Sequence, residues 1–179
     1  TARPWMGRNA IHRLSGVLTA IEDYESRNPV IEGCQYREAL QVVKVEGGIA
    51  GNVVPDSTTL TINHRVAPDR SLDIAEKEIR DLLEPFMEPA DELKVVDAAP
   101  PAKPGLSNPI LASMIESHQL NVQAKLGWTD VAFFDQKGIP AANFGPGDAT
   151  LAHTSNEQVE RSSIDQCYLA LKQIITEGV

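Results

Sequence analysis

The stretch Ala98-Ala-Pro-Pro-Ala-Lys-Pro-Gly105 divides the sequence into two unlike halves. Its prolines and its glycine disfavour both helices and strand ladders, because proline has no backbone N–H and glycine has no side chain to pack. We interpret the stretch as a linker or crossing strand between two domains. The domains would be residues 1–100 and residues 101–179.

The first half is predicted to be α+β, with the order α-β-β-α-β. One more strand before Thr1 would complete the split β-α-β-β-α-β unit of ferredoxin-like domains. The chain also starts abruptly, without an initiator Met, so we expect it to be a fragment. The predicted elements are a helix from Asn9 to about Arg27, strands over 36–45 and 58–66, a helix beginning at 68–71 and a strand over 93–96.

The second half alternates helices and short apolar strands, a pattern typical of a parallel α/β sheet. It is too short for a complete doubly wound domain, so we expect it to be the C-terminal portion of a larger one. The predicted elements are a helix over 109–118, a strand over 122–126, a helix opened by Thr129-Asp130, a buried strand over 141–144 and a last helix over about 163–176.

Composition excludes several classes of function. Acidic residues outnumber basic ones by 25 to 16, for a net charge of −9, and no basic run occurs, so nucleic acid is not an expected partner. No segment approaches the roughly 20 apolar residues that span a bilayer, so no membrane role is expected. Cys34 and Cys167 have no metal-binding spacing and are interpreted as reduced thiols of a cytoplasmic protein.

The most informative motif is Asn143-Phe-Gly-Pro-Gly-Asp-Ala-Thr-Leu-Ala-His153-Thr-Ser-Asn-Glu157. It predicts a strand end, a Gly/Pro loop and the start of a helix, an arrangement in which α/β proteins gather ligands. His153 is either a solvated loop residue or a metal ligand. Glu157 either orients its imidazole or belongs to the first turn of the helix. Asp148 is either a site residue or an ordinary turn residue.

Three further positions are candidates, and each has an ordinary structural role by default. Thr129 or Asp130 caps a helix, and the nearby backbone N–H groups could also face a ligand carboxylate. Asn52, beside Gly51, is by default a turn residue. Arg65, on the polar face of its predicted strand, is by default solvated, although arginine suits bidentate binding of a carboxylate.

Four motifs together resemble the M20 metallopeptidase family and, within it, the desuccinylases of lysine and diaminopimelate synthesis. The resemblance covers essentially the whole chain and is more specific for the family than for the substrate. The motifs are Thr1-Ala-Arg-Pro-Trp-Met-Gly-Arg-Asn-Ala10, Gly51-Asn-Val-Val-Pro-Asp56, Gly127-Trp-Thr-Asp130, and Asn143-Phe-Gly-Pro-Gly with His153-Thr-Ser-Asn-Glu157.

The resemblance implies a two-domain subunit. A catalytic α/β domain would hold two zinc ions, with cobalt as a possible substitute, and an inserted ferredoxin-like lid would form a homodimer. Residues 1–100 match the lid without its first strand, and residues 101–179 match the C-terminal part of the catalytic domain. The other metal ligands and the general-base Glu have no counterpart here, so the chain alone is expected to be inactive.

The resemblance also assigns individual residues. His153 matches the final metal ligand. Asn52 would enter the partner subunit's active site and stabilise the oxyanion, and Arg65 would bind a carboxylate of a small N-acyl amino acid, N-succinyl-LL-diaminopimelate in the leading hypothesis. The residues that would line the substrate pocket are Arg3, Gly127, Thr129 and Asp148.

Two other hypotheses remain open at this point. One is a different M20 hydrolase, such as an acetylornithine deacetylase or an aminoacylase. The other is a non-catalytic dimerisation or ligand-binding module whose strands pair at their edges.

Overall fold

The computed structural model describes residues 1–125 and 127–178, which form two compact units. The first unit combines Thr1–Pro29 with Tyr36–Pro101. The second combines Val30–Gln35 with the chain from Ala102 onward. Among the described residues, no helix is long and apolar enough to cross a membrane.

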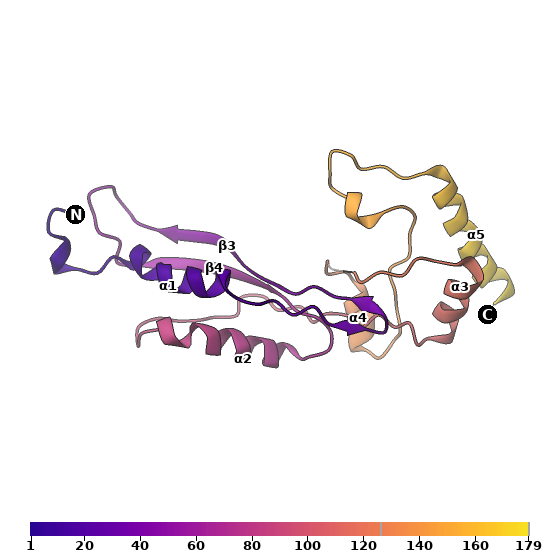
Figure 1. Ribbon diagram of the computed structural model, residues 1–179, viewed down its shortest axis with the longest axis horizontal. Helices are drawn as coiled ribbons and strands as arrows, with labels where there is room; N and C mark the ends of the chain where they lie inside the picture. The colour runs from indigo at the N-terminus through magenta and orange to yellow at the C-terminus, as the bar shows by residue number, and fades with distance from the viewer. Residues whose placement is uncertain (126, 179) are drawn as a thin grey trace. The chain divides into compact units, whose positions relative to one another are not determined.

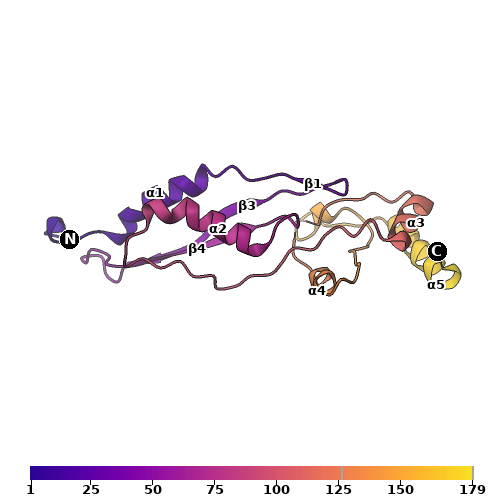
Figure 2. The ribbon, with the colours of Figure 1, turned by 90° about the horizontal axis from the view of Figure 1, so that it is seen from below.

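The first unit is a β-hairpin with two helices packed on one face (Figures 1 and 2). Strands β3 and β4 pair antiparallel from Ala39↔Arg65 to Gly47↔Thr58, with an irregularity between Val42 and Lys44. The elements are η1 (Pro4–Met6), α1 (Ala10–Glu22), β3 (Ala39–Gly47), β4 (Thr58–Arg65), α2 (Leu72–Leu83) and η2 (Glu84–Phe86).

Both helices of this unit begin at a capping side chain. Asn9 Oδ1 accepts hydrogen bonds from the backbone N–H groups of Ile11 (3.0 Å) and His12 (3.2 Å), as the sequence predicts. Ser71 Oγ accepts from Ile74 N in the same way (3.3 Å). Helix α1 ends at Glu22, about five residues earlier than expected.

The core of the first unit joins one residue of α1, one of β3 and two of α2: Ile21, Leu40, Ile79 and Leu83. From β4, Leu60 and Ile62 pack against this cluster, while Asn63 and Arg65 point to solvent. The alternation of faces predicted for this strand is therefore confirmed, and it places the polar residues of β4 on the open side of the hairpin.

The third strand expected in this unit is absent from the structure. Leu93 packs against the core, but residues 93–96 have no ladder partner, and Val96 is 87% exposed. The prediction of a strand here was wrong, because alternating apolar residues do not supply the neighbour with which a strand must pair. Within the described residues the sheet has two strands, so a ferredoxin-like arrangement remains a proposal.

The second unit is mainly helical, with one small hairpin. Two predicted helices lie close to where the sequence put them, at Pro109–His118 and Arg161–Glu177. Asn108 caps the first of them through Oδ1, which accepts from Ile110 N at 2.9 Å. The elements are β1 (Val30–Ile31), β2 (Cys34–Gln35), α3 (Pro109–His118), α4 (Val131–Gln136), η3 (Ala149–Leu151) and α5 (Arg161–Glu177).

The parallel sheet expected in the second unit does not form among the residues described. Residues 122–125 and 141–144 adopt no strand, and Leu126, the last residue of the first predicted strand, lies outside the described residues. Both predictions were wrong for the same reason: a parallel strand is stabilised by ladder partners and by helices on both faces, and this unit provides neither. Cys34 and Cys167 are free thiols, as expected.

One buried carboxylate connects the ends of four elements in the first unit. The Glu38 side chain is fully buried just before β3. Its Oε1 accepts from Ala67 N after β4 (2.9 Å) and from Arg27 Nη1 after α1 (3.3 Å). Its Oε2 accepts from Arg70 Nη2 before α2 (2.6 Å), and the Arg70 side chain is itself only 9% exposed. Asp69 and Glu78 pair with the outer sides of Arg27 and Arg70.

Removing the charge of Glu38 is expected to destabilise the first unit strongly. Glu38→Gln would remove the buried carboxylate from Arg70, which would keep only the partly exposed Glu78 as a partner, at a cost of up to about 3–5 kcal/mol in the free energy of unfolding, measured by urea denaturation. Glu46→Gln breaks an exposed pair with Lys44 and is the matched control, with an expected loss below about 1 kcal/mol. Equal losses in the two variants would contradict the role given to Glu38.

The stability of this unit is expected to fall below neutral pH because of His64. The His64 ring packs edge-on against Tyr24, with centroids 6.0 Å apart, and Nε2 is buried with no hydrogen-bond partner among the described residues. Burial first, and then the Arg70 charge, lower the pKa of His64, while Glu38 and Glu78 oppose this shift. The unfolded chain therefore binds more protons, and stability is lost as pH falls below about 6.5, the ordinary value for histidine.

Urea denaturation between pH 5 and 7 measures this effect. His64→Phe keeps an aromatic ring against Tyr24 and should flatten the pH dependence relative to the unmodified chain. An unchanged slope in the variant would assign the pH dependence to other groups.

Candidate functional site

The candidate residues are distributed over both units. Arg3, Asn52 and Arg65 belong to the first unit. The second unit holds Gly127, Thr129, Asp148 and His153.

Asn52 lies in the exposed loop between β3 and β4, next to the N-terminal segment. Its backbone oxygen accepts from Thr1 N (3.1 Å) and from Thr1 Oγ1 (3.4 Å). Further along, Ala10 N donates to Pro55 O (2.9 Å). These contacts hold residues 1–10 along the loop, so Arg3, exposed just before η1, lies at the same end of the hairpin as Asn52 (Figure 1).

Arg65 lies at the other end of the same hairpin. It pairs with Ala39, whereas Thr58, which follows the Asn52 loop, pairs with Gly47. Seven residue steps along a strand correspond to roughly 23 Å. Arg65 and Asn52 of one chain are therefore too far apart to contact the same small molecule.

In the second unit, a side-chain hydrogen bond connects two of the sequence motifs. Asn143 Nδ2 donates to Thr129 Oγ1 at 3.0 Å, so the Gly127-Trp-Thr-Asp130 segment and the start of the Gly/Pro loop lie together. Trp128 packs edge-on against Phe133 of α4, with centroids 5.2 Å apart. Asp130 is the N-cap residue of α4, but its side chain makes no capping hydrogen bond.

Asp148 serves as a turn residue in this structure. Its Oδ1 accepts from Thr150 N (2.8 Å) and Thr150 Oγ1 (2.7 Å), and these hydrogen bonds lower the pKa of the carboxyl group. The preceding Gly147 has φ +81° and donates its N–H to Ser163 Oγ at 2.8 Å. A Cβ atom at Gly147 would come within 3.1 Å of Val159, so glycine suits this position. The loop is thereby tied to the first turn of α5.

His153 is exposed and has a left-handed backbone, with φ +63°. This conformation costs a residue other than glycine of the order of 1–2 kcal/mol. The backbone N–H of His153 donates to Glu157 Oε2 at 3.0 Å. Glu157 therefore binds the main chain, not the imidazole, and it precedes α5, which begins at Arg161. The structure thus shows neither of the roles considered from the sequence: Glu157 does not orient the imidazole, and it does not belong to the first turn of the helix. Backbone strain at a loop histidine is a feature of functional sites.

The described residues supply one candidate metal donor in this loop, not a complete site. They contain no group of three or more His, Cys, Asp or Glu side chains able to hold a metal ion. The His153 imidazole makes no hydrogen bond within the described part of the chain, which leaves both ring nitrogens open to a ligand. An exposed, unengaged imidazole fits zinc as one ligand, and further donors must come from outside this set.

The sequence did not single out Asn143 or the backbone role of Glu157. Asn143 stands at the end of an apolar segment, where a polar side chain usually faces the adjoining loop, and this signal could have identified it. The Glu157 contact depends on the left-handed turn at His153, which a histidine in a sequence does not predict.

Comparison with known proteins identifies the class. The model of the M20 peptidase dimerisation domain matches residues 1–91, and the chain belongs to this family. Over 164 residues it is 46% identical to the Mycobacterium tuberculosis protein named "Putative succinyl-diaminopimelate desuccinylase DapE", covering 92% of this chain and 46% of that protein. It is 38% identical over 178 residues to the succinyl-diaminopimelate desuccinylase of Corynebacterium glutamicum, covering 99% and 48%.

A more distant relative is the [LysW]-lysine/[LysW]-ornithine hydrolase of Saccharolobus solfataricus, 29% identical over 133 residues, which cover 72% of this chain and 36% of the relative. The chain spans about half the length of the curated relatives it matches. The resemblance to M20 peptidases is therefore confirmed by both kinds of comparison.

Proposed function

We propose that this chain is part of a dinuclear-zinc amidohydrolase that removes the succinyl group from N-succinyl-LL-diaminopimelate. The observation that carries this proposal is the similarity to two proteins named as succinyl-diaminopimelate desuccinylases, which extends over 92% and 99% of the chain. The reaction is hydrolysis of an amide, and its product would serve lysine and diaminopimelate synthesis in the cytoplasm.

Each half of the chain has a distinct part in this proposal. Residues 1–100 would be a ferredoxin-like dimerisation lid. The family match to residues 1–91 and the packing of two helices on one face of β3 and β4 support this assignment. Residues 101–179 would be the C-terminal part of the catalytic domain, because the similarity to both desuccinylases continues beyond the dimerisation domain.

His153 would provide a metal ligand from the loop before α5. Two bound zinc ions would lower the pKa of a water molecule and so supply the nucleophile for amide hydrolysis. The hydrogen bond from His153 N–H to Glu157 fixes the backbone of this ligand, and the bonds of Gly147 and Asp148 fix the loop before it. A preorganised loop reduces the conformational entropy lost when a ligand binds.

The distance between Arg65 and Asn52 supports a site shared by two subunits. The guanidinium of Arg65 would bind a carboxylate of the substrate with two parallel hydrogen bonds. The Nδ2–H group of Asn52 would donate to the oxyanion that forms at the amide carbon, a contact worth about 3 kcal/mol of barrier. Since the two residues lie at opposite ends of one hairpin, each would serve a different active site of a homodimer.

The remaining candidate residues would contact the substrate around these groups. Thr129, positioned by Asn143, would offer a hydroxyl group, and Gly127 beside it would offer an unobstructed backbone. Asp148 would line the substrate pocket from the loop that precedes α5. Arg3, at the Asn52 end of the hairpin, would contribute a second positive charge toward a dicarboxylate substrate, which the protein's net charge of −9 otherwise repels.

Zinc content and turnover test the assignment of His153. In the intact M20 protein that contains this chain, we expect about two zinc ions per subunit and hydrolysis of N-succinyl-LL-diaminopimelate. His153→Ala should remove most activity and weaken one zinc site, as measured by metal analysis after dialysis. His12→Ala, on the exposed surface of α1, is the control and should change neither quantity. Near-normal turnover in His153→Ala would refute the assignment.

Subunit mixing tests whether Asn52 acts in the partner's site. Asn52→Ala and His153→Ala proteins should each be almost inactive alone. After unfolding and refolding together in equal amounts, half the dimers are mixed and each has one complete site, so activity should recover to about a quarter of the unmodified level. No recovery, with mixed dimers verified by differently tagged subunits, would mean that Asn52 and His153 serve the same subunit.

A further inference from the structure

Two exposed arginines are neighbours on the open face of the β3–β4 hairpin. Arg65 of β4 pairs with Ala39 of β3, and directly opposite residues of an antiparallel ladder point to the same face. Along residues 36–41, the even-numbered side chains are buried and the odd-numbered ones are exposed or half-buried. Arg37 therefore shares the open face with Ala39 and is the diagonal neighbour of Arg65.

The register also sets the distance between the two arginines. Diagonal neighbours on one face of a sheet have Cβ atoms roughly 7–8 Å apart, a distance that long side chains can span. Only the small side chain of Ala39 lies between them in the ladder. The next pair along, Gln41 and Asn63, adds two exposed amide side chains to the same face. This end of the open face is thus lined by hydrogen-bond donors.

Unlike most arginines of the first unit, these two have no carboxylate partner within the described chain. Arg37 and Arg65 form no ion pair and no side-chain hydrogen bond with any described residue. Neighbouring like charges repel one another, and an anionic ligand between them would remove this repulsion. The arginines of this unit that do pair with Asp or Glu are Arg8, Arg13, Arg27, Arg70 and Arg80.

The buried Glu38 carboxylate fixes the backbone beside both arginines. Glu38 directly follows Arg37, and its Oε1 accepts from Ala67 N (2.9 Å), two residues after Arg65. The Glu38 side chain points to the buried face, where it is already neutralised, so it does not compete for the exposed guanidinium groups. A backbone fixed in this way reduces the conformational entropy lost when a ligand binds.

We propose that Arg37 and Arg65 together bind two carboxylate groups of one substrate molecule, and that Arg37 thereby selects substrates with more than one carboxylate. This rests on the proposed function, in which Arg65 binds one carboxylate of N-succinyl-LL-diaminopimelate. Each guanidinium offers two parallel N–H donors to a carboxylate. An N-acyl amino acid with a single carboxylate leaves one guanidinium unpaired, so the pair favours a succinylated substrate over a monocarboxylate one.

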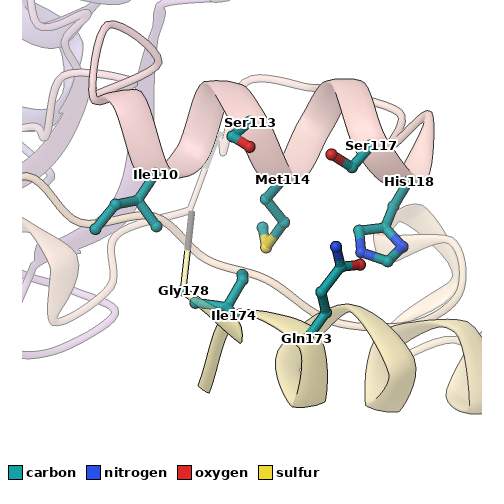
Figure 3. A pocket seen from close by; sticks show the side chains of 8 residues that line it. All are labelled: Ile110, Ser113, Met114, Ser117, His118, Gln173, Ile174 and Gly178. Atoms are coloured by element: carbon teal, nitrogen blue, oxygen red, sulfur yellow. The ribbon is translucent and has the colours of Figure 1, made fainter. Parts of the chain in front are cut away.

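The small cavity of the second unit is less suited to such a ligand. Figure 3 shows it between α3 and α5, with Met114, His118 and Gln173 among its lining side chains. None of the residues that line it is Arg or Lys. A dicarboxylate would lose hydration there without gaining an ion pair.

Kinetics of the intact M20 protein that contains this chain test the role of Arg37. Arg37→Gln should raise KM for N-succinyl-LL-diaminopimelate roughly 10- to 100-fold and change kcat less than about threefold, because it removes a charged hydrogen bond made equally in the ground and transition states. Arg37→Lys keeps the charge but not the paired donors, so its KM should be intermediate. Lys77→Gln removes the same charge from an exposed side chain of α2 and is the control, with an unchanged KM.

Binding of small acids measures the same pair without turnover. Isothermal titration of the intact protein, with a chelator present to remove zinc, compares succinate with the monocarboxylate acetate. We expect Arg37→Gln to weaken succinate binding roughly tenfold and acetate binding less than about threefold. The urea midpoint of Arg37→Gln should match that of the unmodified protein, since the Arg37 side chain has no partner among the described residues.

The outcomes distinguish the role of Arg37 from the proposed function. Hydrolysis of N-succinyl-LL-diaminopimelate with an unchanged KM in Arg37→Gln would overturn the role of Arg37 and leave the proposed function standing. Weaker succinate binding in this variant of a protein that does not hydrolyse the substrate would support the pair and refute the proposed function. Equal weakening of succinate and acetate, or no succinate binding by the unmodified protein, would mean that Arg37 does not bind a second carboxylate.

Discussion

The first unit depends on one negative charge that is removed from water. The Glu38 carboxylate is fully buried, and its cost of desolvation is offset by a backbone N–H and two guanidinium groups. These donors come from Arg27, Ala67 and Arg70, which follow α1, follow β4 and precede α2. Because a buried carboxylate needs these hydrogen-bond donors, it fixes the positions of the segments that follow α1, follow β4 and precede α2. The apolar cluster around Leu40 packs between the same elements.

The pairing of β3 and β4 also determines where the candidate site residues of the first unit lie. A ladder of fixed register keeps Arg65 and Asn52 at opposite ends of the hairpin, and the Thr1 contacts hold the N-terminal segment at the Asn52 end. A rigid hairpin can therefore present a carboxylate-binding group at one end and an amide donor at the other without bringing them together. In the proposed enzyme, two copies would complete each other's sites, and the separation of Arg65 and Asn52 within one chain is compatible with that arrangement.

The sequence correctly predicted helix caps, strand faces and helices that depend on residues close together in the chain. It did not predict strand pairing, which depends on residues far apart in the chain. The Asn9 cap, the faces of β4 and the last helix follow from side chains a few residues apart, and the structure confirms them. The strand predictions were wrong over 93–96, 122–125 and 141–144, because a strand forms only with a partner strand, and the spacing of apolar residues does not indicate where that partner is. The left-handed backbone conformation of His153 could not be predicted either, since a histidine in the sequence does not by itself indicate that conformation.

The second unit, as far as it is described, lacks two of the expected strands and leaves apolar side chains of α5 exposed. Segments 122–125 and 141–144 were expected to be strands, yet the described residues of the second unit provide no ladder for them. The same unit leaves an apolar face of α5 without a neighbour. Among the described residues, the Thr129–Asn143 hydrogen bond and the turn at His153 are therefore held by local hydrogen bonds and not by a sheet.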